Sequence, residues 1–97
     1  MTFGENVLKF YRNLKIKEPL PPGVVVMNPY QDKDCFDICT SFYHQYYNDN
    51  NKRYLILGIN PGRYGAGLTG IPFTDPIKLE TLFGIKNPFP KKPELSA

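Results

Sequence analysis

Cysteine and histidine are scarce in this sequence, which has two cysteines and one histidine among its 97 residues. Cys35 and Cys39 are spaced to share one face of a helix, where a common metal ion is conceivable. A structural zinc site, however, usually takes about four ligands of these kinds. We therefore expect no metal site and no cofactor in this chain.

Long apolar runs and a leader-like start are also missing. The first residues do not combine a basic start with an apolar stretch, and no segment is long and apolar enough to span a bilayer. We therefore expect reduced thiols in a cytoplasmic protein, or a nuclear one if the organism is a eukaryote, with no membrane partner.

Ten prolines and eight glycines interrupt the chain and leave few long regular elements. A hydrophobic content of 41% and an aromatic content of 14% nevertheless favour a globular chain over a disordered one. The length allows one small domain, and the sequence contains no internal repeat or domain boundary. The net charge of +3 suits a polyanionic partner but does not decide for one.

Capping residues and apolar spacing predict three helices, over about residues 3–15, 34–48 and 75–83. Thr2 and Glu5 form a capping box at the start of the first helix. The second begins at a cap formed by Asp32 or Asp34. In the third, Asp75 is the cap and proline occupies the first turn.

Two short apolar segments, 24–27 and 54–58, are predicted to be extended. The second is too short for an ordinary helix and is bounded by turn residues, which indicates a buried strand of a parallel sheet. Residues 86–97 have no periodicity and contain three prolines, so we expect a loop or tail there.

A glycine-rich loop follows the second extended segment. Ligands of open α/β sheets bind outside the carboxyl ends of the strands, and the four glycines from Gly62 to Gly70 allow close backbone approach. Gly65–Gly70 has the form G-x-G-x-x-G, but an Ile-Pro pair follows it, so no helix opens behind it as a dinucleotide site requires. Gly62–Gly67 has P-loop spacing, but a Leu-Thr pair stands where Lys-Ser or Lys-Thr is needed.

Two motifs of this region resemble those of the uracil-DNA glycosylase superfamily. They are Gly58-Ile59-Asn60-Pro61-Gly62, of the form G-[IM]-N-P-G, and Thr69-Gly70-Ile71-Pro72-Phe73, of the form T-G-x-P-F. Their separation is similar to that of the single-strand-selective monofunctional (SMUG) branch, and the mismatch-specific uracil glycosylases are the next most similar. The resemblance covers about residues 24–86. It implies an α/β fold, a partial three-layer αβα domain with a parallel sheet, truncated after the first catalytic motif, with residues 1–97 as the N-terminal part of that single domain.

The resemblance also implies an activity: a monomeric DNA-repair enzyme that hydrolyses the N-glycosidic bond of uracil or a 5-substituted uracil in DNA. Asn60 matches the residue that holds the attacking water, and Phe73 matches the residue on which the flipped base stacks. The backbone N–H of Ile59 is expected to meet a base carbonyl. Gly62 stands where strict uracil enzymes have a tyrosine and leaves space near the base C5. Arg63 either contacts a DNA phosphate or is only solvated.

Three parts of the superfamily's site have no counterpart after residue 86 of this sequence. They are an Asn that reads the uracil edge, a histidine motif that stabilises the leaving base anion, and a loop that wedges into the duplex. His44 is in the wrong place to supply the second. We therefore expect an incomplete glycosylase that is inactive alone. The alternatives are a non-catalytic nucleic-acid or nucleobase-binding module and a non-functional fragment.

Overall fold

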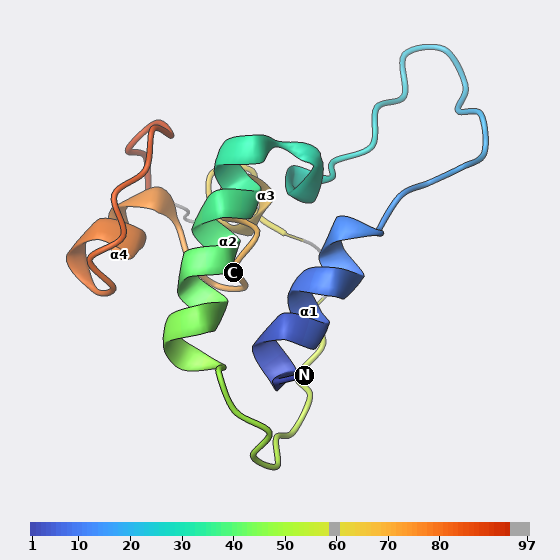
Figure 1. Cartoon of the computed structure of the whole chain (residues 1–97). Coiled ribbons are helices and arrows are strands. Elements are labelled where there is room, and N and C mark those ends of the chain that lie inside the picture. Colours follow the sequence, from blue (N-terminus) through green and yellow to red (C-terminus); the bar gives the residue numbers. More distant parts are fainter. Residues whose placement is uncertain (59–60, 94–97) are drawn as a thin grey trace.

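A computed structural model of the chain describes residues 1–58 and 61–93 as helices joined by irregular segments (Figure 1). The elements in chain order are α1 (Phe3–Arg12), the 3-10 helix η1 (Pro29–Gln31), α2 (Lys33–Tyr46), α3 (Ala66–Thr69) and α4 (Pro76–Thr81). α1 and α2 lie side by side, and the connection between them extends away from both (Figure 1). None of these described helices is long and apolar enough to cross a membrane.

The three expected helices are confirmed at their starts. Thr2 Oγ1 accepts from the Glu5 N–H at 3.2 Å, and Glu5 Oε1 accepts from the Thr2 N–H at 3.1 Å. Asp32, the first of the two alternatives, caps α2, and Asp75 caps α4. Each helix ends a little earlier than its apolar pattern suggested. At the end of α1, the Asn13 side chain donates to the Lys9 carbonyl at 3.0 Å, and this cap stops the helix.

Gly4 allows the start of α1 to meet the end of α2. The N–H groups of Phe3 and Gly4 donate to the carbonyls of Asp49 and Tyr47 at 2.7 and 2.8 Å. A Cβ at Gly4 would lie 2.8 Å from the Tyr43 carbonyl oxygen, so a side chain there would push the helices apart. The free donors of one helix end thus satisfy acceptors beyond the other.

The core joins α2 to the segment that follows the glycine loop. Its buried hydrophobic members are Leu8, Cys35, Ile38, Cys39, Phe42, Tyr43, Ile71, Leu79 and Ile85. Both cysteines are free thiols on the buried face of α2, as their spacing predicted. Among the described residues, no group of three or more His, Cys, Asp or Glu side chains is arranged to hold a metal ion.

The parallel sheet expected from the sequence is not formed by the described residues, which contain no strand. Segments 24–27 and 54–58 are irregular, and Tyr54, Leu55, Ile56 and Leu57 are 83–88% exposed. Among the described residues, the Val24 N–H donates to the Pro21 carbonyl at 3.2 Å, but no backbone hydrogen bond joins the two segments to each other. A strand exists only where a neighbour satisfies its N–H and C=O groups, and neither segment has one here. The apolar pattern of 54–57 is therefore present without the burial that it predicted.

Gly70, at the end of α3, is the position where the backbone conformation and the close packing both require glycine. Its φ is +73°, and a Cβ would lie 2.7 Å from Tyr30 Cε1, 2.8 Å from Cys39 Sγ and 2.9 Å from Cys35 Sγ. Gly84 has a similar φ of +66° but no heavy atom within 4 Å of such a Cβ.

We expect Gly70→Ala to lower the free energy of unfolding by at least about 2 kcal/mol, because left-handed strain and overpacking add. Gly84→Ala is the matched control and should lose only about 1 kcal/mol, from the backbone alone. Urea unfolding followed by circular dichroism measures both. Equal losses would mean that the thiols and the Tyr30 ring move aside at no cost.

Candidate functional site

The glycine loop folds back on itself through the carbonyl of Gly62. That oxygen accepts from the N–H groups of Gly65 at 3.3 Å and Gly67 at 2.8 Å. A Cβ at Gly67 would lie 2.6 Å from the same oxygen and 3.0 Å from Met27 Sδ. The close backbone approach expected of these glycines therefore occurs, but in this structure it is approach of the loop to itself.

Phe73 has the most unusual backbone of the described chain. Its φ is +58°, and no other described residue except glycine has a positive φ. Its side chain is 78% exposed, although Ile71 before it and Thr74 after it are only 2% and 6% exposed. A bulky L-residue in this region is strained, and such strain is typically found at functional positions. Phe73 is thus an exposed ring on a loop that is anchored on both sides.

The Thr69 hydroxyl joins the two sides of this loop from within. It donates to the Thr74 carbonyl at 2.8 Å and accepts from the Ile71 N–H at 3.1 Å. Thr69 is fully buried, so no water competes for these bonds. The Thr74 hydroxyl in turn donates to the Pro72 carbonyl at 3.0 Å. Together these bonds close a hydrogen-bonded turn whose backbone includes Phe73.

Tyr30 of η1 holds the same loop at Gly70. Its hydroxyl donates to the Gly70 carbonyl at 2.8 Å, and its ring stacks on Tyr11 with centroids 3.9 Å apart and planes 6° apart. Burial, the largest cause, raises the pKa of Tyr30 above its ordinary value, so the hydroxyl keeps the proton that it donates. Cys39 Sγ donates to the neighbouring Thr69 carbonyl at 3.3 Å. Elements far away in the sequence thus hold the loop.

The predicted site residues divide between described and undescribed positions. Gly62 and Phe73 both belong to the folded loop, with Gly62 half-buried and Phe73 exposed. Arg63 is exposed, which agrees with either of its two expected roles. Asn60 and Ile59 lie outside the described residues, so their roles stay predictions. Sequence reasoning assigned no role to Thr69, although that residue opens the T-G-x-P-F motif.

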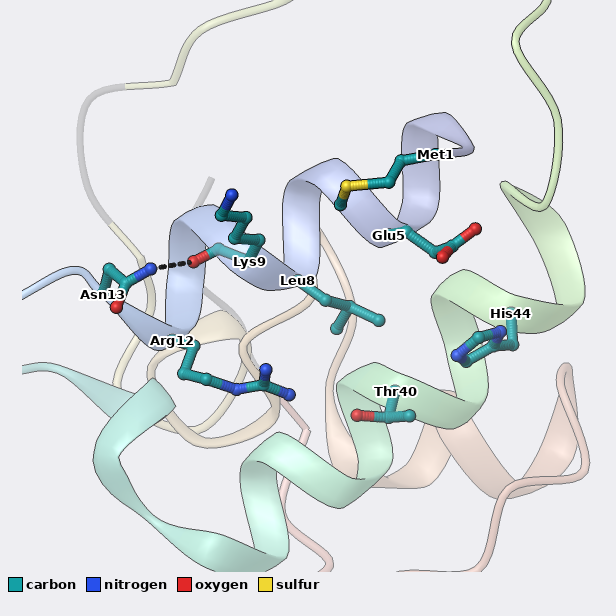
Figure 2. Close-up of a pocket in the computed structure, with 8 residues that line it drawn as sticks. All are labelled: Met1, Glu5, Leu8, Lys9, Arg12, Asn13, Thr40 and His44. Carbon is teal, nitrogen blue, oxygen red and sulfur yellow. Dashed lines mark hydrogen bonds between the residues drawn. The ribbon is translucent and has the colours of Figure 1, made fainter.

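A separate hollow of about 410 Å³ lies between α1 and α2 (Figure 2). Its lining residues are Met1, Glu5, Leu8, Lys9, Arg12, Asn13, Thr40 and His44, none of which belongs to the glycine loop. Glu5 bonds the backbone and hydroxyl of Thr2, and the Arg12 guanidinium lies 5.1 Å from the Phe36 ring centre. These polar groups therefore serve the helices around the hollow.

Comparison with known proteins supports one relationship. No protein-family model and no curated protein matches the chain. Among solved structures, SMUG2 from Pedobacter heparinus matches 99% of this chain at 48% sequence identity with a TM-score of 0.82. The resemblance to the amino-terminal portion of a SMUG-like uracil-DNA glycosylase is thereby confirmed.

The match to SMUG2 is also partial in one direction, because this chain covers 41% of the length of SMUG2. The SMUG-like relationship therefore extends over nearly all of this chain, including the loop that carries Phe73, and over less than half of its relative.

Proposed function

We propose that this chain carries the water-positioning and base-stacking part of a DNA glycosylase that hydrolyses the N-glycosidic bond of uracil or a 5-substituted uracil. The observation that carries the proposal is Phe73, an exposed ring held at φ +58° at the end of the second motif that resembles a glycosylase site. The 48% identity to SMUG2 supports it.

Phe73 would receive the flipped base. A base taken out of the DNA stack loses its neighbours, and an aromatic face replaces them at a gain of about 1–3 kcal/mol. Single exposed apolar side chains are common, so the exposure of Phe73 has weight only together with its positive φ. Phe73 is 78% exposed in a strained turn, and stacking on a base explains both features.

Asn60 would hold the attacking water. During hydrolysis the bond between C1′ and the base nitrogen breaks, its electron pair leaves with the base, and a water adds to C1′ with loss of a proton. The sugar cation is electrophilic enough that a positioned water suffices. The amide oxygen of Asn60 can accept a hydrogen bond from that water but cannot take up the proton. The backbone N–H of Ile59 would meet a base carbonyl beside it.

Arg63 is the loop residue that we propose contacts a DNA phosphate. Other arginines of the described chain have partners: Arg53 forms an ion pair with Asp49 at 2.8 Å and lies over the Phe3 ring, and Arg12 lies over Phe36. Arg63 is exposed beside Gly62. Phosphate contacts position a protein on DNA without reading its sequence.

The test uses a hybrid in which this chain replaces the segment of SMUG2 that it matches. We expect the hybrid to release uracil from a single-stranded oligonucleotide, with intact SMUG2 as the reference and each part alone as a control. Release by neither part but by the hybrid supports the proposal. A folded hybrid that binds the oligonucleotide without releasing uracil would contradict it and favour the alternative, a non-catalytic nucleobase-binding module, which the exposed Phe73 ring also suits.

The specificity of this site is expected to depend on Gly62. A tyrosine ring in its place would occupy the space beside the base C5, so Gly62→Tyr in the hybrid should favour plain uracil. The measurement is the ratio of excision rates for 5-hydroxymethyluracil and uracil, which should fall about tenfold or more. Asn50→Tyr, at an exposed position outside the predicted site, is the control and should leave the ratio unchanged. An unchanged ratio for Gly62→Tyr would place Gly62 away from C5.

A further inference from the structure

We infer that Thr69 and Tyr30 are positioning residues that hold the Phe73 ring in place before a base arrives. The inference rests on the proposed function, in which Phe73 stacks on the base. Neither hydroxyl is expected to touch the base itself. Thr69 ties the two sides of the turn from which the ring projects, and Tyr30 fixes Gly70 just before that turn.

Thr69 has the geometry for this role. A hydroxyl has one proton to donate, and the Thr74 carbonyl at 2.8 Å is a closer acceptor than the Ile71 carbonyl at 3.3 Å. The same oxygen accepts from the Ile71 N–H at 3.1 Å. One side chain thereby ties the residues on both sides of Pro72 and Phe73, which are the exposed part of the turn.

Tyr30 fixes the chain just before the turn. Its hydroxyl holds the Gly70 carbonyl at 2.8 Å, immediately before Ile71. The ring cannot shift easily, because it stacks on Tyr11 and its own backbone N–H donates to the Asn28 side chain at 3.1 Å. Gly70 itself has no space for a Cβ against this ring.

Fixed anchors are needed because the backbone of Phe73 is unfavourable. An L-residue other than glycine prefers negative φ, so a free turn would relax and move the ring. Holding an aromatic ring where the base will stack avoids ordering it during binding. The two hydroxyls therefore act on the affinity for the base through Phe73.

The test places a reporter at the ring position. The chain has no tryptophan, so Phe73→Trp introduces a single indole at an exposed site, and excitation at the red edge of the indole absorption avoids the seven tyrosines. Time-resolved anisotropy measures the mobility of Trp in the free chain, and fluorescence quenching by a single-stranded uracil oligonucleotide measures stacking. The same oligonucleotide with an abasic site at the uracil position is the control for stacking. All measurements are made in about 1 M trimethylamine N-oxide to keep the variants folded.

In this background, Thr69→Val removes the hydroxyl but keeps the shape of the side chain. We expect a larger fast component of the anisotropy decay and about tenfold weaker binding, the effect of one lost hydrogen bond of ordinary strength. Tyr30→Phe should change both in the same direction. Thr69→Ser retains the hydroxyl, so its anisotropy decay and its affinity for the oligonucleotide should match those of the Phe73→Trp chain. Thr81→Val, which removes an exposed hydroxyl bonded to the Ile77 carbonyl at 3.0 Å, should change neither.

The outcomes separate the two proposals. Absence of uracil-dependent quenching in the Phe73→Trp chain would contradict the stacking function, while the anisotropy still tests positioning. Unchanged anisotropy in both Thr69→Val and Tyr30→Phe would overturn the inference. Loss of helical circular dichroism in both would also overturn it, because the hydroxyls would then be needed for the fold as a whole.

Discussion

Asn60→Ala in the SMUG2 hybrid is expected to slow single-turnover release of uracil by about 30- to 1,000-fold, with little change in oligonucleotide binding. Removal of one preorganised polar group from a catalytic site typically raises the barrier by on the order of 2–4 kcal/mol. The proposed role of Asn60 is to hold the water that attacks C1′, and this contact matters during bond cleavage more than during binding.

The control for Asn60→Ala is Asn50→Ala, in the connection after α2, which is exposed and outside every predicted site. It should leave both the rate and the binding unchanged. Single-turnover rates under saturating enzyme separate cleavage from product release. An unchanged cleavage rate for Asn60→Ala would remove Asn60 from the mechanism and leave the source of the attacking water unassigned.

The starts of the helices could be predicted because their signals are local. Thr2, Asp32 and Asp75 each bond an N–H only three residues away, so a short stretch of sequence contains the whole interaction. The end of α1 was predicted less well, because it depends on the side chain of Asn13 bonding back to Lys9 and not on apolar spacing.

The anchors of Phe73 could not be predicted in this way. Tyr30 bonds the carbonyl of Gly70, 40 positions later in the chain, so no local pattern connects the two. The role of Thr69 depends on its complete burial and on the positive φ of Phe73, neither of which the T-G-x-P-F letters specify. The motif predicts where the site is, and only the packed structure shows what holds Phe73.

In segment 54–57 a clear local pattern predicts a burial that the described chain does not provide. Its sequence predicts a buried strand, yet its four side chains are 83–88% exposed in the described chain. Burial of a strand depends on neighbouring strands, which the local pattern does not contain. The 41% coverage of SMUG2 supports the proposal that the missing neighbours belong to the uncovered part of such a domain.

The chain of 97 residues alone is expected to release no uracil and to unfold over a broad temperature range. The side chains of residues 54–57 would contribute about 6 kcal/mol or more if they were buried, which is comparable to the whole stability of a small domain. The described chain leaves these side chains exposed and therefore lacks this stabilisation. Leucine offers a matched comparison, because Leu79 is fully buried and Leu55 is 88% exposed. Leu79→Ala should remove about 3 kcal/mol and unfold the isolated chain, and Leu55→Ala should leave its thermal curve unchanged.

The same pair of leucines separates the isolated chain from the hybrid. In the SMUG2 hybrid, Leu55→Ala should become destabilising by about 2 kcal/mol or more, because the proposed neighbouring strands would bury that side chain. Circular dichroism during heating measures all four cases, and a uracil-release assay accompanies each. A sharp, cooperative transition of the isolated chain would contradict the expected instability. Uracil release by the isolated chain that Asn60→Ala abolishes would contradict the expected inactivity, and would mean that residues 1–97 supply the leaving-group assistance that their sequence does not reveal.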